Sequence, residues 1–209
     1  MLQHMGPLAI QFLTKIFNLC IEEDTWIWNK SHICFIKKAG KPSYMEPGAY
    51  RPLTISSYVG KLLERVIENR LKEFCNSNNI LDNAQEGFRS KRSTTRYLYR
   101  LTASLHEARM KKLVSMVLFI DFEKAFDSVW IPGLIVKLNR HGIKGKLLRI
   151  ISTYLSGRIM SLRINSYFGR DRHCLEYGLP QGSVLSPLLF IIYIADLLHY
   201  PHLPTEAAK

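Results

Sequence analysis

The chain has 209 residues, of which 47% are hydrophobic and 22% are charged, and its 29 Lys and Arg outnumber its 17 Asp and Glu. This length predicts one large domain, or one and a half small ones, and the composition excludes a chain that is disordered throughout. The formal net charge of +12 indicates a polyanionic partner, which is either nucleic acid or an anionic membrane surface.

Cysteine spacing and apolar stretches narrow the class of protein further. The cysteines at positions 20, 34, 75 and 174 include no Cys-x-x-Cys pair, so zinc and disulfide frameworks are poorly supported and reduced thiols in an intracellular protein are expected. The longest apolar stretch, residues 184–198, is shorter than the roughly 20 residues of a membrane span, and the first residues lack a signal-peptide pattern. We therefore expect no membrane partner and favour nucleic acid.

Hydrophobic periodicity predicts a mixture of helices and strands. Helices are predicted over residues 8–23, 57–75, 93–110, 131–140 and 145–156, and from about residue 184. Short strands are predicted over residues 32–37, 158–165 and 173–177, with loops over 37–52, 166–169 and 178–183. Residues 114–120 are almost continuously apolar and predict a central strand buried on both faces. Because long helices come early and strands are grouped late, we expect an α+β fold.

The predicted central strand ends in a carboxylate, Asp121, within the segment FIDFEKAFDSV at 119–129. An acidic side chain at the rim of a sheet can reach a cation or a substrate, although a strand-end Asp that caps the following turn is an equally good interpretation. Asp127 follows in a turn, where a capping role or an ion pair with a nearby Arg is favoured.

A Gly/Pro loop leads into the last apolar helix, in the segment GLPQGSVLSPLLF at 178–190. Gln181 lies close to two glycines, so its amide can project toward a planar ligand, and a helix N-terminus after a Gly-rich turn suits an anion. A generic junction between a loop and a helix is the alternative, and this segment alone is a weak signal for a phosphate site.

Basic side chains are interleaved with aromatic ones over residues 85–112, where eight basic residues accompany two acidic ones. Cations for phosphates and rings for stacking allow a protein to hold a nucleic-acid strand without reading its sequence. A solvated helix face is the alternative. Lys37, Lys38 and Arg51 flank the loop at 37–52 and can clamp a triphosphate by charge and a guanidinium fork.

These elements occur in an order that resembles a known family. The matching motifs are Trp28 with the strand that follows it, FIKKAGK with AYRPLTISS, LLERVIENRL, LDNAQEGFRSKRST, FIDFEKAFDSV and GLPQGSVLSPLLFIIYIADL. The chain resembles the reverse transcriptases of non-LTR retrotransposons (LINE-type elements), and within them the jockey-like arthropod group. The resemblance extends over roughly residues 8–200, which is nearly the whole chain.

The resemblance implies a right-hand polymerase fold, incomplete in this chain, with an antiparallel sheet packed on helices. Residues 1–113 would form an N-terminal extension and the fingers, residues 114–200 a partial palm, and residues 201–209 a truncated tail. It also implies nucleotidyl transfer with two Mg²⁺ ions, for which Asp121 and the backbone carbonyl of Phe122 would be ligands. The implied partners are an RNA template, a DNA primer and a dNTP, and the implied location is the nucleus.

The same resemblance assigns roles to further side chains. The nucleotide-binding positions would be Lys37 or Lys38, Arg51, Gln181 and Phe126, whose ring would stack under the sugar and exclude a 2′-hydroxyl. The template-binding positions would be Gln85, Gly87, Phe88, Arg89 and Arg92. Asp196 is expected to have a structural or capping role, since its position corresponds to the end of a helix in the family.

The sequence departs from the family in one respect. The family carries a Phe/Tyr-Ala-Asp-Asp hairpin after the last helix, whereas these residues contain no Asp-Asp pair. One carboxylate and one carbonyl cannot hold two dications close together, because their repulsion needs several anionic ligands to offset it. We therefore expect little or no polymerase activity from the chain alone. The alternative is a non-catalytic nucleic-acid-binding remnant of such an element.

Overall fold

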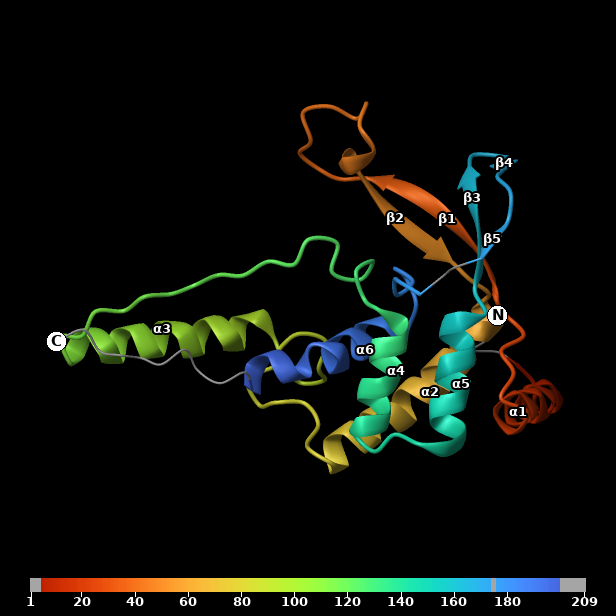
Figure 1. The fold of residues 1–209 in the computed structure, drawn as a ribbon, viewed down its shortest axis with the longest axis horizontal. Coiled ribbons are helices and arrows are strands. Elements are labelled where there is room, and N and C mark those ends of the chain that lie inside the picture. Colours follow the sequence, from red (N-terminus) through yellow and green to blue (C-terminus); the bar gives the residue numbers. More distant parts are fainter. Residues whose placement is uncertain (1–4, 174–175, 200–209) are drawn as a thin grey trace.

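The computed structural model describes residues 5–173 and 176–199. Its α-helices are α1 (Pro7–Glu22), α2 (Tyr58–Ser77), α3 (Thr94–Met110), α4 (Ile131–Arg140), α5 (Gly145–Ser156) and α6 (Ser186–Tyr193). Its strands are β1 (Lys30–Lys37), β2 (Tyr50–Ile55), β3 (Ile159–Ile164), β4 (Tyr167–Phe168) and β5 (Arg172–His173), with short 3-10 helices η2 (Pro47–Ala49) and η3 (Ala195–His199). Figure 1 shows the sheet above the central helices, with α1 and α3 on opposite sides. The predicted helices are confirmed, and their ends agree to about two residues.

Helix ends follow the local chemistry of the sequence. Ser57 and Ser93 are N-caps, and their hydroxyls accept hydrogen bonds from the backbone N–H groups of Gly60 at 3.4 Å and Arg96 at 3.2 Å. A proline in the first turn begins α1, α4 and α6, where its missing N–H leaves no intrahelical bond unmade. Both signals can be recognised in the sequence, which explains why the helix bounds were predicted well.

The hydrophobic core lies between the central helices. On α2 the buried side chains Leu63, Ile67 and Leu71 recur every four residues, which places them on one face of the helix. The other central helices contribute Leu134, Leu138, Ile150, Ile151, Leu155, Leu188 and Leu189. Cys20 and Cys75 are buried free thiols in the same core. Burial raises the pKa of Cys75 to about 11, so its thiol stays protonated at neutral pH.

The strands form one sheet in the order β2–β1–β3–β4, with β5 also paired to β3. Strand β1 pairs antiparallel with β2 but parallel with β3, so the sheet that was expected to be antiparallel also contains one parallel pair. The long connection between β1 and β3, which includes helices, permits the parallel pair. Strand β2 begins inside the loop predicted over 37–52, and β4 lies in the turn predicted over 166–169. Residues 174–175 of the predicted last strand lie outside the described residues.

The central strand predicted over residues 114–120 is not formed, and this prediction is wrong. The segment runs unpaired from the end of α3 toward α4 (Figure 1, green), with Val114 98% exposed and Met116 96% exposed. A strand needs a neighbour to bond its backbone N–H and C=O groups, and the described sheet does not include this segment. An apolar stretch is buried only when another segment covers it. The described residues provide no strand that pairs with this stretch.

Helix α3 projects from the body of the molecule (Figure 1), and none of its residues is buried. It carries Arg96, Arg100, Arg109, Tyr97 and Tyr99, which are part of the basic and aromatic segment predicted to bind nucleic acid. Within residues 5–173 and 176–199, no helix combines the length and the hydropathy that crossing a bilayer requires.

Candidate functional site

The loop that carries Gln181 is fixed against strand β2. The backbone N–H of Thr54 donates a hydrogen bond to the carbonyl of Gln181 at 2.7 Å. Gly182 has a φ of +108°, and a Cβ built there would lie 2.9 Å from the carbonyl oxygen of Thr54. Glycine is required at this position, because a side chain is compatible neither with that backbone angle nor with so close an approach.

A buried carboxylate on α2 holds the other side of the same loop. Glu64 is 2% exposed, and its Oε2 accepts hydrogen bonds from Ser183 Oγ at 2.6 Å and from the backbone N–H groups of Val184 at 2.7 Å and Leu185 at 3.4 Å. Burial raises the pKa of Glu64, and these hydrogen bonds offset part of that rise. These hydrogen bonds give the backbone N–H groups at the start of α6 an acceptor, and they connect α2 to the Gln181 loop.

Tyr154 completes this network. Its hydroxyl donates a hydrogen bond to Ser183 Oγ at 2.7 Å, and burial raises the pKa of Tyr154, so the hydroxyl stays protonated and remains a donor. Neither Glu64 nor Tyr154 was predicted from the sequence as a site residue. The available signal was the position of Glu64 beside Leu63 in the apolar register of α2, from which its side chain points toward the core.

The segment that follows Asp121 is aligned with the same loop. The backbone N–H of Leu179 donates to the carbonyl of Phe126 at 2.8 Å. The side-chain amide of Gln181 donates to Asp127 Oδ1 at 3.2 Å. The structure therefore brings Gln181 and Asp127 together, a contact that differs from both roles expected of Asp127, which were turn capping and an ion pair with an arginine.

Three aromatic rings meet beside this loop. The half-buried Phe126 ring stacks on Phe190, with centroids 5.1 Å apart, and meets Phe88 edge-on at 6.2 Å. Phe88 belongs to the predicted template-binding segment and has a φ of +57°. One residue predicted to bind template and one predicted to bind nucleotide are thus in contact, and packing restricts the orientation of the Phe126 ring.

Two predicted template-binding arginines take part in the fold itself. Arg89 donates hydrogen bonds to the backbone carbonyls of Leu81 at 3.3 Å and Asp82 at 2.6 Å. Arg92, whose side chain is 12% exposed, donates to a backbone carbonyl in the same loop and lies 3.5 Å from the buried carboxylate of Glu86. These contacts brace the loop, so removing either arginine would change stability as well as any contact with nucleic acid.

The remaining template-binding positions are more accessible. Gly87 is exposed, and Gln85 donates its side-chain amide to the carbonyl of Gly87 at 3.2 Å. Arg96 and Arg100, on the first turns of α3, have half-exposed side chains 3.5 Å from Glu86. They continue the basic surface from the loop onto the helix.

The predicted triphosphate-binding cations lie on two different faces of the β1–β2 hairpin. Lys37 is directly opposite Tyr50 in register, so Lys37 and Arg51 point to opposite faces, since neighbouring residues in a strand alternate. Leu53 shares the face of Arg51, and its Cδ1 would lie 3.1 Å from a Cβ at Gly182. Arg51 is therefore on the face that meets the Gln181 loop, and Lys37 is not.

The lysines are held by the loop that joins the two strands. Lys38 donates its ammonium group to the carbonyl of Gly48 at 3.1 Å. Lys37 Nζ lies 4.9 Å from the centre of the Tyr44 ring, a distance suited to a cation–π interaction. Arg51 is exposed, which leaves its guanidinium accessible to a ligand.

Asp121 and Phe122 are both exposed on the unpaired segment. In the described part of the chain, no group of three or more His, Cys, Asp or Glu is arranged to hold a metal ion. These residues therefore do not by themselves fit a two-metal centre. Asp196 has the structural role expected of it, since it binds Lys137 at 2.7 Å and this hydrogen bond lowers its pKa.

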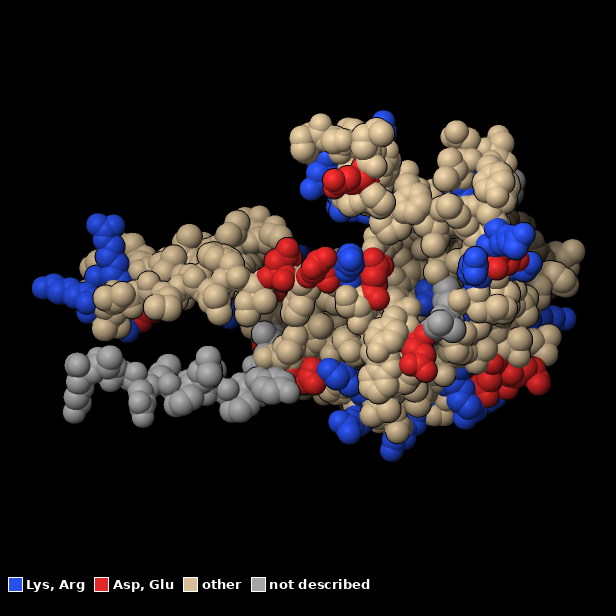
Figure 2. All heavy atoms as spheres, turned by 45° about the horizontal axis from the view of Figure 1, so that its top comes forward, with Lys and Arg blue, Asp and Glu red and all other residues tan. Residues whose placement is uncertain are grey.

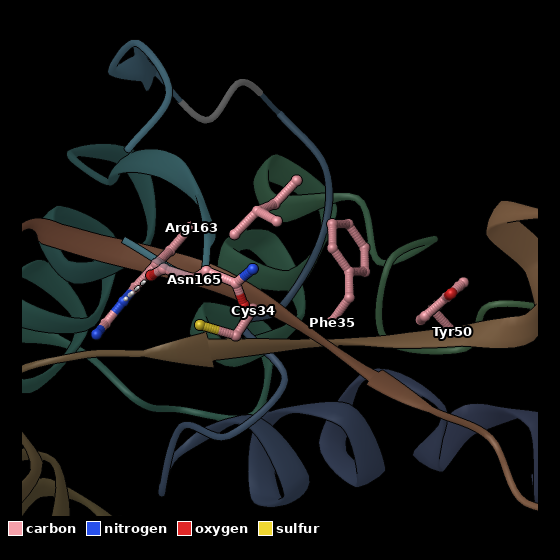
Figure 3. Close-up of a pocket in the computed structure, with 6 residues that line it drawn as sticks. Cys34, Phe35, Tyr50, Arg163 and Asn165 are labelled. Atoms are coloured by element: carbon pink, nitrogen blue, oxygen red, sulfur yellow. Dashed lines mark hydrogen bonds between the residues drawn. The ribbon is translucent and has the colours of Figure 1, made fainter. Parts of the chain in front are cut away.

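A separate open pocket of about 590 Å³ lies where β1 and β3 diverge (Figure 3). Pairing of the two strands ends at Ile33 and Leu162, and the residues that follow on each strand line the pocket. The lining residues are Cys34, Phe35, Tyr50, Arg163, Ile164 and Asn165. None of them is a predicted site residue, so we do not place the substrate there.

Charge is unevenly distributed over the surface. Figure 2 shows Lys and Arg side chains at the outer end of α3, and a short row of mostly acidic side chains across the middle of the molecule. Arg109 lies in the last turn of α3 and Lys111 and Lys112 follow the helix. The exposed acidic residues of the 121–127 segment are Asp121, Glu123 and Asp127. The basic side chains at the outer end of α3 are thus separate from the row of acidic side chains, and Asp121 is the one carboxylate of the 121–127 segment that was predicted to bind a metal ion.

Residues 36–203 match the family model described as reverse transcriptase (RNA-dependent DNA polymerase). The chain belongs to the reverse transcriptase family. Over 191 residues, it is 36% identical to the probable RNA-directed DNA polymerase from transposon BS and 31% identical to the RNA-directed DNA polymerase from mobile element jockey, both of Drosophila melanogaster. Each match covers 90% of this chain and 20–21% of the relative, so this reverse transcriptase domain spans about a fifth of their length.

These relatives confirm the resemblance to non-LTR retrotransposons of the jockey type. A further relative, the retrovirus-related Pol polyprotein from type-1 retrotransposable element R2 of Popillia japonica, is 28% identical over 171 residues, covering 82% of this chain and 23% of the relative. Reverse transcriptases generally use divalent metal ions in catalysis. The matched region includes both the Asp121 segment and the Gln181 loop of this reverse transcriptase domain.

Proposed function

We propose that this reverse transcriptase domain supplies the fingers and part of the palm of a polymerase that extends a DNA primer on an RNA template. Residues 1–113 form the N-terminal extension and fingers, and residues 114–200 form part of the palm. The convergence of separate segments on one loop supports this proposal. Gln181 is bonded to β2 through Thr54 and to the segment after Asp121 through Asp127.

Each of these residues is assigned to a different part of the incoming nucleotide. Gln181 contacts the nucleotide, the ring of Phe126 lies under its sugar, and Arg51 binds the triphosphate through its planar fork of donors. Arg51 shares a face of the hairpin with Leu53, which meets the Gln181 loop, and this supports Arg51 rather than Lys37 as a ligand of the triphosphate. Lys38, in the loop that joins β1 and β2, is the second cation of the proposed site. Phe88 and the basic residues of the template segment and α3 hold the template.

We propose Mg²⁺ as the divalent ion, with Asp121 and the carbonyl of Phe122 among its ligands. A single exposed carboxylate does not offset the repulsion between two dications, and the described residues contain no fuller ligand cluster. Further anionic ligands must therefore come from outside the described residues. Because the family acts at chromosomal DNA, we also propose a nuclear location for the working enzyme.

The chain alone is expected to bind an RNA–DNA primer–template without extending it. Binding should weaken steeply with salt, with a log–log slope of about −0.7 to −0.9 for each phosphate that a basic side chain neutralises, and it should show little base preference. Fluorescence anisotropy over a salt series measures the binding. A primer-extension assay with Mg²⁺ measures the extension. Extension above that of a heat-denatured control would contradict the ligand argument, and salt-independent binding would contradict the phosphate contacts.

Replacing Arg51 with alanine is expected to weaken dNTP binding roughly tenfold, because a charge-assisted hydrogen bond to phosphate is lost. Lys37→Ala is the matched control, since it removes one cation from the opposite face of the same hairpin, and it should change affinity by less than about twofold. Titration of a dNTP into the ¹⁵N-labelled chain, followed by amide chemical shifts, gives both affinities. Equal losses in the two variants would contradict the assignment of faces.

A non-catalytic nucleic-acid-binding role is the second candidate. It is favoured by α3, which carries exposed basic and aromatic side chains on a helix that projects from the body of the molecule. This role requires binding to nucleic acid but no specific dNTP site. The Arg51 and Lys37 titrations therefore separate the two candidates.

A further inference from the structure

Glu86 is a buried carboxylate that lies close to several arginines. Its side chain is 5% exposed, and Arg92 Nη1, Arg96 Nε and Arg100 Nη1 each lie 3.5 Å from its Oε1. Its Oε2 is also buried and has no hydrogen-bond partner among the described residues. A buried carboxylate is costly unless cations compensate its charge. Here three guanidinium groups lie beside one carboxylate, so the cluster keeps an excess of positive charge.

The arginines of this cluster differ in how much of each guanidinium is already bound. The side chain of Arg92 is 12% exposed, and its guanidinium also donates to the backbone carbonyl and the side-chain oxygen of Asn83. The side chains of Arg96 and Arg100 are 53% and 51% exposed, and Glu86 is their one side-chain partner among the described residues. A guanidinium has five N–H donors, so both groups keep donors for an anion from solution.

Arg96 and Arg100 lie one turn apart on the same face of α3. Residues four apart on a helix have Cβ atoms about 5–6 Å from each other, and each guanidinium can bind a phosphate through two parallel N–H groups. Two such groups in a row fit neighbouring phosphates of one nucleic-acid strand. The ring of Phe88, two residues after Glu86, is 56% exposed and is available for stacking beside these contacts.

We propose that Arg96 and Arg100 bind neighbouring phosphates of the template strand, and that Glu86 is the positioning residue that holds their guanidinium groups for this contact. The inference rests on the proposed function, from which it takes the template as the partner. It assigns the phosphate contacts to two arginines of α3, whereas Arg89 and Arg92 brace the loop through backbone carbonyls.

Arg96→Ala and Arg100→Ala test the phosphate contacts. The probe is an RNA–DNA primer–template with a single-stranded RNA overhang, and fluorescence anisotropy is measured over a salt series. Each variant should weaken binding severalfold and reduce the size of the log–log salt slope by about 0.7–0.9, because one phosphate contact is lost. Arg170→Ala is the matched control, since Arg170 is an exposed arginine between β4 and β5, and it should leave the slope unchanged.

Glu86→Gln tests the positioning role through the sign of its effect. On a surface that is merely basic, removal of an acidic group tightens binding, because a charge that repels phosphates is lost. If Glu86 holds the two guanidinium groups, the variant should instead weaken binding about threefold. Glu107→Gln is the matched control, since Glu107 is a glutamate of the same helix with a side chain that is 66% exposed. It should leave the affinity unchanged or raise it.

A combined variant separates positioning from a general effect on the fold. In a chain that already carries Arg96→Ala and Arg100→Ala, Glu86→Gln should weaken binding no further, because the groups that it holds are absent. Urea unfolding followed by circular dichroism shows whether each variant is folded. If Glu86→Gln lowers the stability, the variants of the two half-exposed arginines still test the phosphate contacts.

Three results would overturn the proposal. The first is a salt slope for Arg96→Ala and Arg100→Ala equal to that of Arg170→Ala, which would leave the cluster a structural ion network. The second is tighter binding by Glu86→Gln. The third is a loss of affinity from Glu86→Gln that persists in the combined variant, which would place its effect in the loop. Absence of primer–template binding by the unmodified chain would instead contradict the proposed function, so the two failures can be distinguished.

Discussion

Replacing Glu64 with alanine is expected to lower the free energy of unfolding by about 3 kcal/mol. The change leaves the backbone N–H group of Val184 without its acceptor and opens a space beneath the Gln181 loop, whereas the N–H of Leu185 keeps its hydrogen bond to Ser183 Oγ. A buried unpaired donor costs about 1–3 kcal/mol, and the lost side-chain packing adds to this. Urea unfolding at neutral pH, followed by circular dichroism, measures the change.

Glu64→Gln is the matched variant, because it keeps an oxygen acceptor of the same shape without the ionisable group. It should cost less than Glu64→Ala. The folded-state pKa of Glu64 is raised above its ordinary value of 4.5, so the folded chain binds the proton more tightly than the unfolded chain does. The stability that this group contributes is therefore present below pH 4.5 and is lost as pH rises through the raised pKa.

The difference in stability between the unmodified chain and Glu64→Gln should accordingly fall as pH rises above 4.5, and it should become constant beyond the raised pKa. Taking the difference removes the titration of the other carboxylates, which both proteins share. A difference that rises with pH would show a lowered pKa and would contradict the dominant effect of burial. Equal stability of Glu64→Ala and Glu64→Gln would contradict the role of the amide hydrogen bonds.

Gly182→Ala is expected to destabilise the chain by about 2–3 kcal/mol and to displace the Gln181 loop. The new Cβ would lie 2.9 Å from the carbonyl oxygen of Thr54, at a φ of +108° that alanine does not readily adopt. Relief of this contact requires the loop to move away from β2, which breaks the hydrogen bond between Thr54 and Gln181. Urea unfolding gives the free energy, and amide chemical shifts of residues 53–55 and 178–185 report the displacement.

Gly48→Ala is the control for Gly182→Ala, because a Cβ at Gly48 meets nothing within 4 Å. Its effect should lie within about 0.5 kcal/mol of zero. If dNTP affinity falls in Gly182→Ala but not in Gly48→Ala, the loop position matters for the proposed nucleotide site. Equal stability of the two variants would show that the loop accommodates the added methyl group without leaving β2.

The helices were predictable because their signals are local. Ser93 caps α3, and prolines begin α4 and α6, and both features act within one turn of the residue concerned. The strand at 114–120 was not predictable in the same way, because seven apolar residues indicate burial but do not specify what covers them. Whether they form a strand depends on a partner far away in the sequence or in another chain.

The candidate site was predictable in its residue types but only partly in its contacts. The motif order identified Asp121, Phe126 and Gln181, and the structure places Gln181 and Phe126 on adjoining segments. The distinction between Lys37 and Arg51 was not predictable, because it depends on the strand register. The buried role of Glu64 was missed, because a glutamate in an apolar register predicts burial only when a partner for its charge is known.

The sequence alone determined the helices and the family of this chain. The helices depend on signals that act within one turn, and the family depends on short motifs that occur in a recognisable order. Only the tertiary structure decided which face of the hairpin meets the Gln181 loop, that Glu64 binds the start of α6, and that residues 114–120 are exposed. The physical reason is that hydrogen bonds and burial between distant segments depend on how the segments pack, and a pattern within one segment does not contain that information.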